Sequence, residues 1–417
     1  MSKQSIHIVG GGIIGLCSAW YLVKEGYQVT VVDRGDFANG TSFGNAGMIV
    51  PSHFEPMAAP GVITQGLKWL LDGRSPFYVK PRLNLDLINW TYHFYRSSTE
   101  KKVQEAMPLL LAFNEESKRL YEEITYREKV DSGYDARGLL MLFKTEKQAA
   151  AEAQLVAQAV KLGMDATILS SQELRSLEPE MNLDVLGGAY FPGDAHLYPN
   201  RLMANMVDRL KAAGVTFFGD TEVMDFEVAN GQITGLVEQS GRVVPVNEVL
   251  LASGSWTATL LKKAGIRMLL QDGKGYSITL ERPALRPRIP TILAEAKVAI
   301  TPMGADLRIG GTLELSGHSP GVNQRRLEGI VDSIPRYYAN LEVPLTPATK
   351  VWKGYRPCTP DGLPYLGRSR KYDNMMVATG HGMMGLSLGA ATGKLISQII
   401  TGQPTFMDVS AFRLDRF

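Results

Sequence analysis

One glycine motif near the N-terminus constrains the fold more than any other feature of the sequence. Gly10-x-Gly12-x-x-Gly15 lies between an apolar strand pattern and an apolar-faced helix pattern over 13–24, and a second strand pattern ends at Asp33. This order predicts a strand–helix–strand unit that binds a dinucleotide. Gly10 permits the tight turn, Gly12 lets a pyrophosphate approach the backbone, and Gly15 allows close helix packing. Asp33 is expected to accept hydrogen bonds from a ribose, and the alternative is a tight turn that binds nothing.

A loop of small and hydroxyl-bearing residues follows this unit. Its backbone N–H groups are suited to face a phosphate or the edge of a flavin, although a plain surface loop has a similar composition. The residues of interest in this loop are Thr41, Ser42, Asn45, Ala46 and Gly47.

The C-terminal region carries a second glycine-rich pattern. A strand pattern leads into Gly380-His381-Gly382, and Gly385, Gly389 and Gly393 then recur every four residues. Each glycine in a helix costs about 1 kcal/mol against alanine, so a neighbouring helix or a flat cofactor ring is expected to approach that face. The positive end of this helix would suit the N1–C2=O edge of a flavin.

Three further residues are candidates for contact with a substrate. Arg356 lies near a strand end before proline, where its planar fork suits a carboxylate, and an internal ion pair with Asp361 is the alternative. His53 could reach the pocket, although a lone histidine is more often structural. Tyr276 could assist a carboxylate or close the pocket.

Composition excludes several other classes of function. The 44 basic and 42 acidic residues give a net charge of +2, which argues against a nucleic-acid partner. Two cysteines, Cys17 and Cys358, provide no disulfide framework and no cysteine-rich metal site, so we expect a reducing compartment and no metal. A strand pattern begins almost at residue 1 and no apolar run reaches eighteen residues, so neither a signal peptide nor a transmembrane segment is expected. We expect a cytoplasmic protein, and the amphipathic stretch 62–71 either packs in the core or contacts the inner face of a membrane.

The chain is long enough for two domains, which the pattern interleaves. The predicted fold class is α/β plus α+β, with a Rossmann-like dinucleotide-binding domain from 1–50, 198–265 and 346–417. An antiparallel-sheet substrate domain is expected from 51–197 and 266–345.

Taken together, these segments resemble the FAD-dependent amine and amino-acid oxidoreductases, a family with a D-amino-acid oxidase-like fold. It includes D-amino-acid dehydrogenase, glycine oxidase and monomeric sarcosine oxidase. The resemblance covers nearly the whole chain, because six segments occur in the family's order. The D-amino-acid dehydrogenase branch is the most similar, through 51–61, 66–69 and 275–277.

The resemblance implies FAD as the cofactor and Arg356 as the clamp for a substrate carboxylate, with Tyr276 and His53 as further catalytic candidates. Sarcosine oxidases carry a tethering cysteine where this chain has Gly354, so non-covalent FAD is expected. The implied FAD-binding residues are Gly10, Gly12, Ile13, Ile14, Gly15, Asp33, Arg34, Thr41, Ser42, Asn45, Ala46, Gly47, Val223, Gly254, Gly380, His381, Gly382, Met383, Met384, Gly385 and Leu386.

The activity implied by the resemblance is oxidative deamination of a D-amino acid by hydride transfer from the α-carbon to flavin N5. D-Proline and hydroxy-D-proline are among the candidate substrates, and a quinone or another acceptor would take the electrons. The alternative is a secondary-amine oxidase of the sarcosine or glycine type that uses oxygen. A flavin-binding protein without turnover and a nicotinamide dehydrogenase also stay open at this point.

Overall fold

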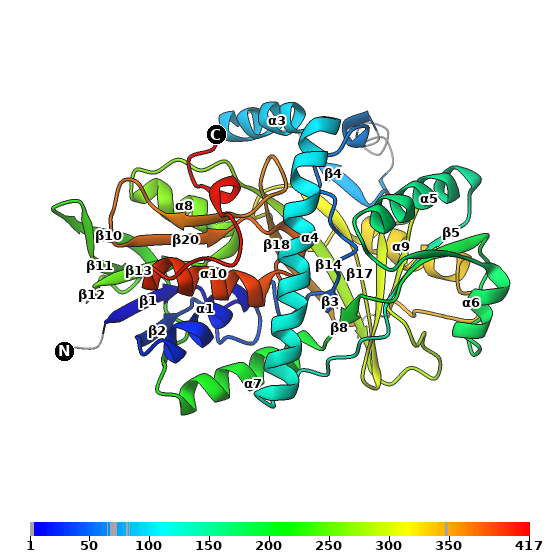
Figure 1. Cartoon of the computed structure of the whole chain (residues 1–417), viewed down its shortest axis with the longest axis horizontal. Helices are drawn as coiled ribbons and strands as arrows, with labels where there is room; N and C mark the ends of the chain where they lie inside the picture. The colour runs from blue at the N-terminus through cyan, green and yellow to red at the C-terminus, as the bar shows by residue number, and fades with distance from the viewer. Residues whose placement is uncertain (1–3, 65, 67–72, 81, 83, 347–348) are drawn as a thin grey trace.

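The glycine motif lies at the carboxyl edge of a six-stranded sheet (Figure 1). The structure is a computed structural model that describes residues 4–64, 66, 73–80, 82, 84–346 and 349–417. Within this sheet, β19 is antiparallel to its neighbour and the other strands are parallel. The strands follow the order β19 (Tyr365–Arg368), β20 (Met375–Thr379), β13 (Glu248–Leu251), β1 (Ser5–Val9), β2 (Gln28–Val32) and β9 (Thr216–Phe218).

Both faces of this sheet are buried because its strands are apolar on both sides. On β1, Ile6 and Ile8 face one hydrophobic core, while Val9 belongs to a core on the opposite face. Helices pack on the first face, and a small sheet with one helix covers the second. The covering elements are α1 (Ile13–Lys24), α7 (Pro199–Ala212) and α10 (Gly389–Thr401) on one face, and β10 (Val223–Ala229), β11 (Gln232–Glu238), β12 (Val243–Pro245) and α8 (Thr257–Lys263) on the other.

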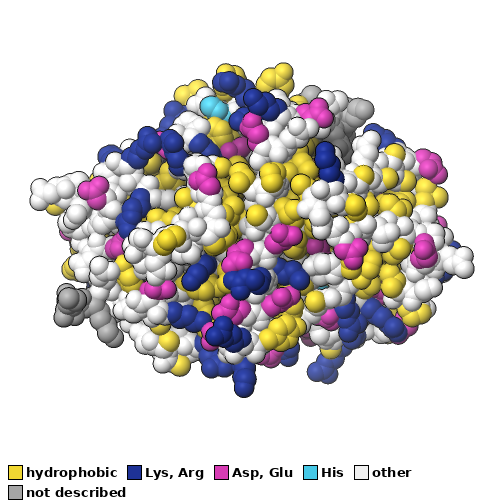
Figure 2. All heavy atoms as spheres, viewed as in Figure 1, with side chains coloured by type: hydrophobic (Ala, Val, Ile, Leu, Met, Phe, Trp, Pro, Cys, Tyr) yellow, Lys and Arg dark blue, Asp and Glu magenta, His cyan; other side chains and the backbone are white. Residues whose placement is uncertain are grey.

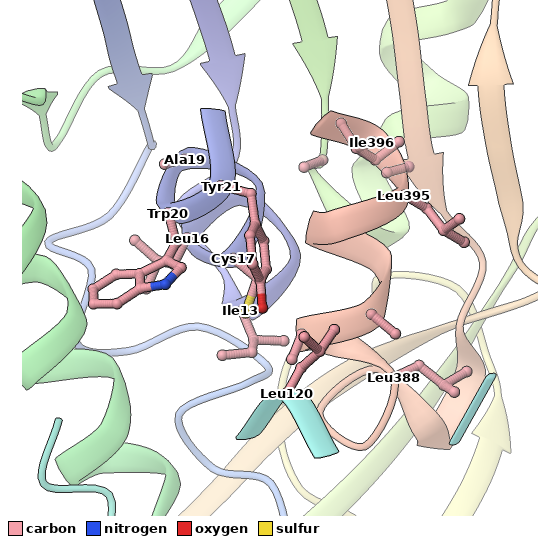
Figure 3. Close-up of a cluster of buried hydrophobic side chains, with 14 of the residues drawn as sticks. Ile13, Leu16, Cys17, Ala19, Trp20, Tyr21, Leu120, Leu388, Leu395 and Ile396 are labelled. Carbon is pink, nitrogen blue, oxygen red and sulfur yellow. The ribbon is translucent and has the colours of Figure 1, made fainter. Parts of the chain in front are cut away.

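Helix α10 lies against α1 at van der Waals distance, and glycine permits this approach. A Cβ atom at Gly393 would lie 2.4 Å from the backbone carbon of Cys17, and one at Gly389 would lie 2.6 Å from the Tyr121 hydroxyl. Figure 3 shows the apolar side chains of α1 and α10 gathered around this contact. A neighbouring helix therefore explains these two glycines.

A nine-stranded sheet makes the other half of the molecule. Most of its strands are antiparallel, and β15–β5 and β17–β4 are parallel pairs. Its main path runs β18 (Val351–Cys358), β14 (Gln271–Leu280), β17 (Asp306–Leu315), β16 (Val298–Met303), β15 (Thr291–Leu293), β5 (Leu139–Phe143), β7 (Gly187–Phe191) and β6 (Thr167–Ser170), with β4 (Phe77–Val79) beside β17.

The remaining elements are short or lie around the two sheets (Figure 1). Strand β3 (Met48–Ile49) pairs with β8 (Ala195–His196) where the chain passes between the halves. Further helices are α3 (Leu85–Ser97), α4 (Glu100–Glu122), α5 (Glu146–Lys161), α6 (Ser171–Leu177) and α9 (Gln324–Ser333), with a π-turn at Glu123–Arg127 and 3₁₀ turns at Gly254–Trp256, Ile334–Arg336, Gly382–Met384 and Ser410–Phe412.

The predicted fold class is confirmed, and two segments cross the expected domain division. Strand β18 falls in the predicted segment 346–417 but hydrogen-bonds to β14 of the nine-stranded sheet. Helix α4 falls in the predicted segment 51–197, yet its Phe113 and Leu120 belong to the core beneath α1 and α10. Local hydrophobic patterns give no information on which sheet or helix an element joins, so these two departures could not be predicted.

The α1–α10 contact predicts the effect of one methyl group. Replacing Gly393 with alanine should lower the melting temperature. The added methyl group would overpack the helix contact and destabilise the fold by about 1–3 kcal/mol, whereas the higher helix propensity of alanine stabilises it by at most about 1 kcal/mol. Thermal unfolding measures the difference, and Gly193→Ala is the control because no neighbour lies within 4 Å of where its Cβ would be. A stabilised Gly393→Ala protein would contradict this packing.

Candidate active site

A cavity of about 1290 Å³ lies between the two sheets. Its lining includes the residues that follow the carboxyl ends of β1, β2, β13 and β20, and residues of β14, β17 and β18 complete its wall. Ligands of open parallel sheets bind outside the carboxyl ends of the strands, which is the side where this cavity lies.

The glycine turn presents backbone to this cavity. Gly10 has a φ of 114°, and a Cβ atom there would lie 2.4 Å from the carbonyl oxygen of Ala252. Gly12 is the N-cap of α1 without a side-chain cap, and the first turn of α1 contains no acidic residue. The Ser42 hydroxyl accepts a hydrogen bond from the Ile13 N–H at 3.1 Å. The helix therefore directs its positive end at the cavity, as a pyrophosphate requires.

Asp33 is held in place by the backbone at the end of β2. Its Oδ2 accepts a hydrogen bond from Gly11 N–H at 2.6 Å, and its Oδ1 accepts one from Gly35 N–H at 2.8 Å. Beside it, the Arg34 guanidinium stacks 3.5 Å from the centre of the Trp256 ring. The cradle of bare backbone, carboxylate and helix N-terminus fits a dinucleotide.

All of the FAD-binding residues expected from the sequence line this cavity except three glycines. These three pack behind it. A Cβ atom would lie 1.9 Å from the Gly10 oxygen at Gly15, 2.2 Å from the Leu197 oxygen at Gly47, and 2.5 Å from Thr359 Cγ2 at Gly380. Glycine at these positions lets neighbouring segments approach, so their contribution to the site is indirect.

The C-terminal glycine pattern forms two elements where the sequence predicts one helix. Residues Gly382–Met384 make a 3₁₀ turn, and α10 begins only at Gly389. Gly385 therefore lies before the helix and lines the cavity, while Gly389 and Gly393 contact α4 and α1. In this loop the His381 Nε2 lies 3.0 Å from the Thr392 hydroxyl, and burial lowers the pKa of His381 to about 3, which keeps it neutral.

Arg356 extends from β18 into the cavity without an acidic partner. Its Nη1 donates a hydrogen bond to the Thr312 carbonyl at 2.6 Å, and it forms no ion pair with any carboxylate of the described residues. Burial lowers the pKa of its guanidinium. The alternative pairing with Asp361 is wrong, because Asp361 makes a two-bond ion pair with Arg416 at 2.7 and 3.0 Å.

A β-bulge in β17 turns the Thr312 carbonyl toward Arg356. Tyr276 pairs with Gly311 and Lys274 pairs with Glu314, so β17 contains one residue more than β14 across this interval. Thr312 adopts a φ of 64°, a region that β-branched residues rarely occupy. Bulges and such strained residues concentrate at functional sites. The sequence pattern contained no signal for Thr312, so this residue was not predicted.

The Tyr276 hydroxyl is not placed beside Arg356. Tyr276 borders the cavity, but its hydroxyl donates to Glu314 Oε1 at 2.8 Å and accepts from the Asn323 N–H at 3.0 Å. Adjacent residues of a strand point to opposite faces. A Cβ atom at Gly275 would lie 2.1 Å from Arg356 Nη1, so the face of Gly275 meets the guanidinium and the Tyr276 side chain lies on the other face.

His53 does line the cavity, in the segment that follows β3. Its Nδ1 lies 3.2 Å from the Ser52 hydroxyl, and burial lowers the pKa of the imidazole to about 4. It is therefore neutral near pH 7. Trp352 also lines the cavity and was not predicted from the sequence, and its ring would collide with a side chain at Gly44 or Gly354.

Neither cysteine lines the cavity. Both Cys17 and Cys358 are buried thiols, and burial raises the pKa of each to about 12. A side chain at Gly354 would overlap the Trp352 ring, with 1.9 Å between its Cβ and the ring. Among the described residues no group of histidine, cysteine and acidic side chains suits a metal ion.

Comparisons with known proteins agree with this geometry. The family model described as DAO, FAD dependent oxidoreductase, matches residues 5–399. D-amino acid dehydrogenase of Helicobacter pylori is 32% identical over 401 residues, covering 95% of each chain. D-amino acid dehydrogenase of Granulibacter bethesdensis is 31% identical, covering 98% of this chain and 99% of the relative.

Solved structures show the same fold. Glycine oxidase from Geobacillus kaustophilus superposes with a TM-score of 0.78 at 23% identity, covering 100% of both chains. L-proline dehydrogenase from P. horikoshii gives 0.74 at 18% identity, covering 100% of this chain and 98% of the other. The chain belongs to the FAD-dependent oxidoreductase family, and the predicted resemblance and cofactor are confirmed.

The positions of the cysteines predict how FAD is attached. Denaturing the FAD-loaded protein with acid or urea should release all of its FAD, because neither thiol lines the cavity whose geometry fits the cofactor. Absorbance of the filtrate against that of the protein pellet measures the released fraction. Flavin that stays with the denatured chain would contradict a non-covalent site.

Proposed function

We propose that this enzyme oxidises the Cα–N bond of a D-amino acid whose carboxylate binds Arg356. The uncompensated guanidinium is the observation that carries the proposal. A partly buried charge without an ionic partner is unfavourable, and its Nε and Nη2 have no hydrogen-bond acceptor among the described residues. A planar carboxylate matches these free donors.

The class of substrate is supported by the relatives. Those reported above are named D-amino acid dehydrogenases, at 31–32% identity over nearly the whole chain. Met48, Val50 and Met57 give the cavity wall near His53 an apolar character, which suits a compact aliphatic side chain. D-Proline and hydroxy-D-proline are the substrates that we propose to test first.

The protein side chains contribute mainly position and electrostatics. FAD, when bound, accepts the hydride that leaves the α-carbon. Arg356 fixes the carboxylate, and the Thr312 carbonyl fixes one arm of Arg356. His381 precedes the 3₁₀ turn Gly382–Met384. It is neutral near pH 7 and therefore adds no positive charge to this part of the cavity. The released imine hydrolyses to a 2-oxo acid, or stays cyclic when the substrate is proline-like.

Arg356→Lys should raise KM for the D-amino acid by about 10- to 100-fold while FAD content stays at the wild-type level. An ammonium group cannot reproduce the paired contacts of the planar fork, and loss of a charged hydrogen bond costs about 1.5–3 kcal/mol. Steady-state kinetics with flavin quantification measures both quantities. Arg368→Lys is the control, because Arg368 is at least one-third exposed and pairs with Glu248 on β13. An unchanged KM in Arg356→Lys would refute the carboxylate clamp.

A lipid-soluble quinone is the electron acceptor that we propose, reached from a membrane surface. The lining of the cavity also includes the apolar side chains of Ile63, Phe77, Trp90 and Phe94, and it reaches Thr91 on α3, which is exposed. Most of the stretch 62–71, which the sequence pattern made a candidate for membrane contact, lies outside the described residues. Among the described residues, no helix is long and apolar enough to span a bilayer.

The outer face of α3 is apolar and exposed beside this opening. Leu85 is 74% exposed and Tyr95 68%, and Ile88 and Tyr92 lie between them on the same helical face. The inner face is apolar too, through Leu87, Trp90 and Phe94, so the exposed apolar residues of α3 are additional to those that it buries. Figure 2 shows hydrophobic, Lys and Arg side chains interspersed at this upper edge of the molecule.

We assign this face to an anionic phospholipid bilayer. Four large side chains are few for a protein interface, which takes about 20–30 residues a side. Tyrosine and arginine prefer the membrane interface, and the Arg96 guanidinium lies 5.9 Å from the Tyr92 ring. The acidic Asp86 of α3 is paired with Arg267, 2.8 Å away.

Ile88→Asp combined with Tyr95→Asp should abolish sedimentation with phosphatidylglycerol vesicles and slow the reduction of a long-chain quinone in those vesicles. Turnover with a water-soluble quinone should be unchanged, because the pair lies outside the cavity. Val228→Asp, another exposed apolar position, is the control. Equal vesicle binding by the wild type, the double variant and Val228→Asp would contradict the membrane assignment. Formation of one peroxide per turnover without any quinone would contradict the quinone acceptor and favour the oxygen-dependent amine oxidase.

A further inference from the structure

A chain of hydrogen bonds leads from the cavity wall into the protein interior at His53. The Ser52 hydroxyl lies 3.2 Å from His53 Nδ1 and 2.5 Å from Asp194 Oδ2. Asp194 Oδ1 also accepts a hydrogen bond from the Ser52 N–H at 3.1 Å. His53 lines the cavity, whereas Ser52 and Asp194 do not. The three side chains thus connect the cavity to a carboxyl group that no ligand in the cavity can touch.

Asp194 is fully buried and forms no ion pair with any of the described residues. Burial raises the pKa of its carboxyl to about 7, against the opposing effects of the Ser52 hydrogen bonds and of Lys118. Its backbone fixes its place, because its N–H donates to the Phe191 carbonyl and its own carbonyl accepts from the Gly138 N–H. A carboxyl group in these surroundings exchanges a proton near neutral pH.

The single proton of the Ser52 hydroxyl determines the state of His53. When Asp194 is ionised, the hydroxyl donates to it and its oxygen accepts from His53, so Nδ1 carries the imidazole proton. Nε2 is then a hydrogen-bond acceptor, and it has no protein partner among the described residues. When Asp194 is protonated, the two hydrogen bonds reverse and the proton resides on Nε2. One chain therefore has two arrangements that differ by one proton at Asp194.

We propose that Asp194, acting through Ser52 and His53, accepts the proton that the substrate ammonium group loses before oxidation. This inference rests on the proposed function, because hydride can leave the α-carbon only when the amine nitrogen has a free electron pair. The N–H bond of the ammonium breaks as His53 Nε2–H forms, Nδ1–H passes to Ser52, and the Ser52 proton passes to Asp194. The amine and the imidazole end neutral, and the carboxyl ends protonated.

The two pKa values explain why the proton ends at Asp194. Burial lowers the pKa of His53 to about 4, so the imidazolium is a poor final holder of the proton. Asp194, with a pKa of about 7, is a better one. His53 would be the catalytic residue of this step, with Ser52 and Asp194 as positioning residues.

Titratable groups around the His53–Ser52–Asp194 hydrogen-bond chain influence the pKa values of its members. Lys297 faces His53 and lowers the pKa of the imidazole, and it also acts on the neighbouring carboxyls of Glu55 and Glu152. Tyr134 and Lys118 face Asp194. Glu152 is a matched control, because it is only 3% exposed but does not belong to the hydrogen-bond chain of His53, Ser52 and Asp194. Its carboxylate accepts a hydrogen bond from Gln148.

The pH profile of kcat/KM with a D-amino acid tests the relay in the FAD-loaded enzyme. Asp194→Asn and Ser52→Ala should lower kcat/KM at pH 7 by about 100-fold, at the low end of general-base effects. The loss should vanish at high pH, where the substrate amine is already neutral. Ser52→Thr, which keeps the hydroxyl, and Glu152→Gln should retain the wild-type profile. A loss in Asp194→Asn and Ser52→Ala that is equal at every pH, or no loss, would overturn the relay.

Thermal unfolding gives a second readout that is independent of turnover. The raised pKa means that the unfolded chain loses the Asp194 proton near 3.8 and the folded chain only near 7, so wild type loses stability as pH rises between these values. The melting temperature of Asp194→Asn minus that of wild type should therefore increase from pH 4 to pH 7. A flat difference would overturn the relay, whereas a wild-type enzyme that no D-amino acid reduces would overturn the proposed function.

Discussion

The contact between the Arg356 guanidinium and the Thr312 carbonyl determines what the cavity can bind. A carbonyl oxygen holds one arm of the cation without neutralising it, so the charge stays available to a ligand. The contact depends on an extra residue in β17 and on the missing side chain at Gly275. Both features lie in the nine-stranded sheet, and they direct the charge toward the carboxyl ends of the parallel strands.

The two sheets contribute different groups to the site. The parallel sheet supplies bare backbone, the N-terminal end of α1 and the Asp33 carboxylate, all of which suit a dinucleotide. The nine-stranded sheet supplies Arg356, the cation that we propose binds a carboxylate. Helix α4 belongs to the core of the first sheet and borders the second, since Phe113 lies under α10 while Met107 packs with β5 and β7. The relative position of cofactor and substrate sites is therefore fixed by a continuous core.

The family and its FAD cofactor could be predicted from local signals in the sequence. Gly10 and Gly12 lie between a strand and a helix, and Asp33 follows further along the sequence. This order indicates a dinucleotide-binding unit. Distant contacts could not be read in this way. Asp361 pairs with Arg416, and the Tyr276 hydroxyl bonds to Glu314 on the neighbouring strand β17. The hydrogen-bond chain from His53 ends far away in sequence, at Asp194. Each of these depends on which strands become neighbours, and hydrophobic periodicity does not specify that.

The central claim is that a substrate carboxylate completes the charge of Arg356 beside FAD. Anaerobic mixing of the FAD-loaded enzyme with D-proline or with pyrrolidine, the same ring without the carboxylate, tests it most directly. We expect D-proline to bleach the flavin absorption band in a saturable manner and pyrrolidine to leave it unchanged at the same concentrations. Equal bleaching by the two compounds would contradict the account.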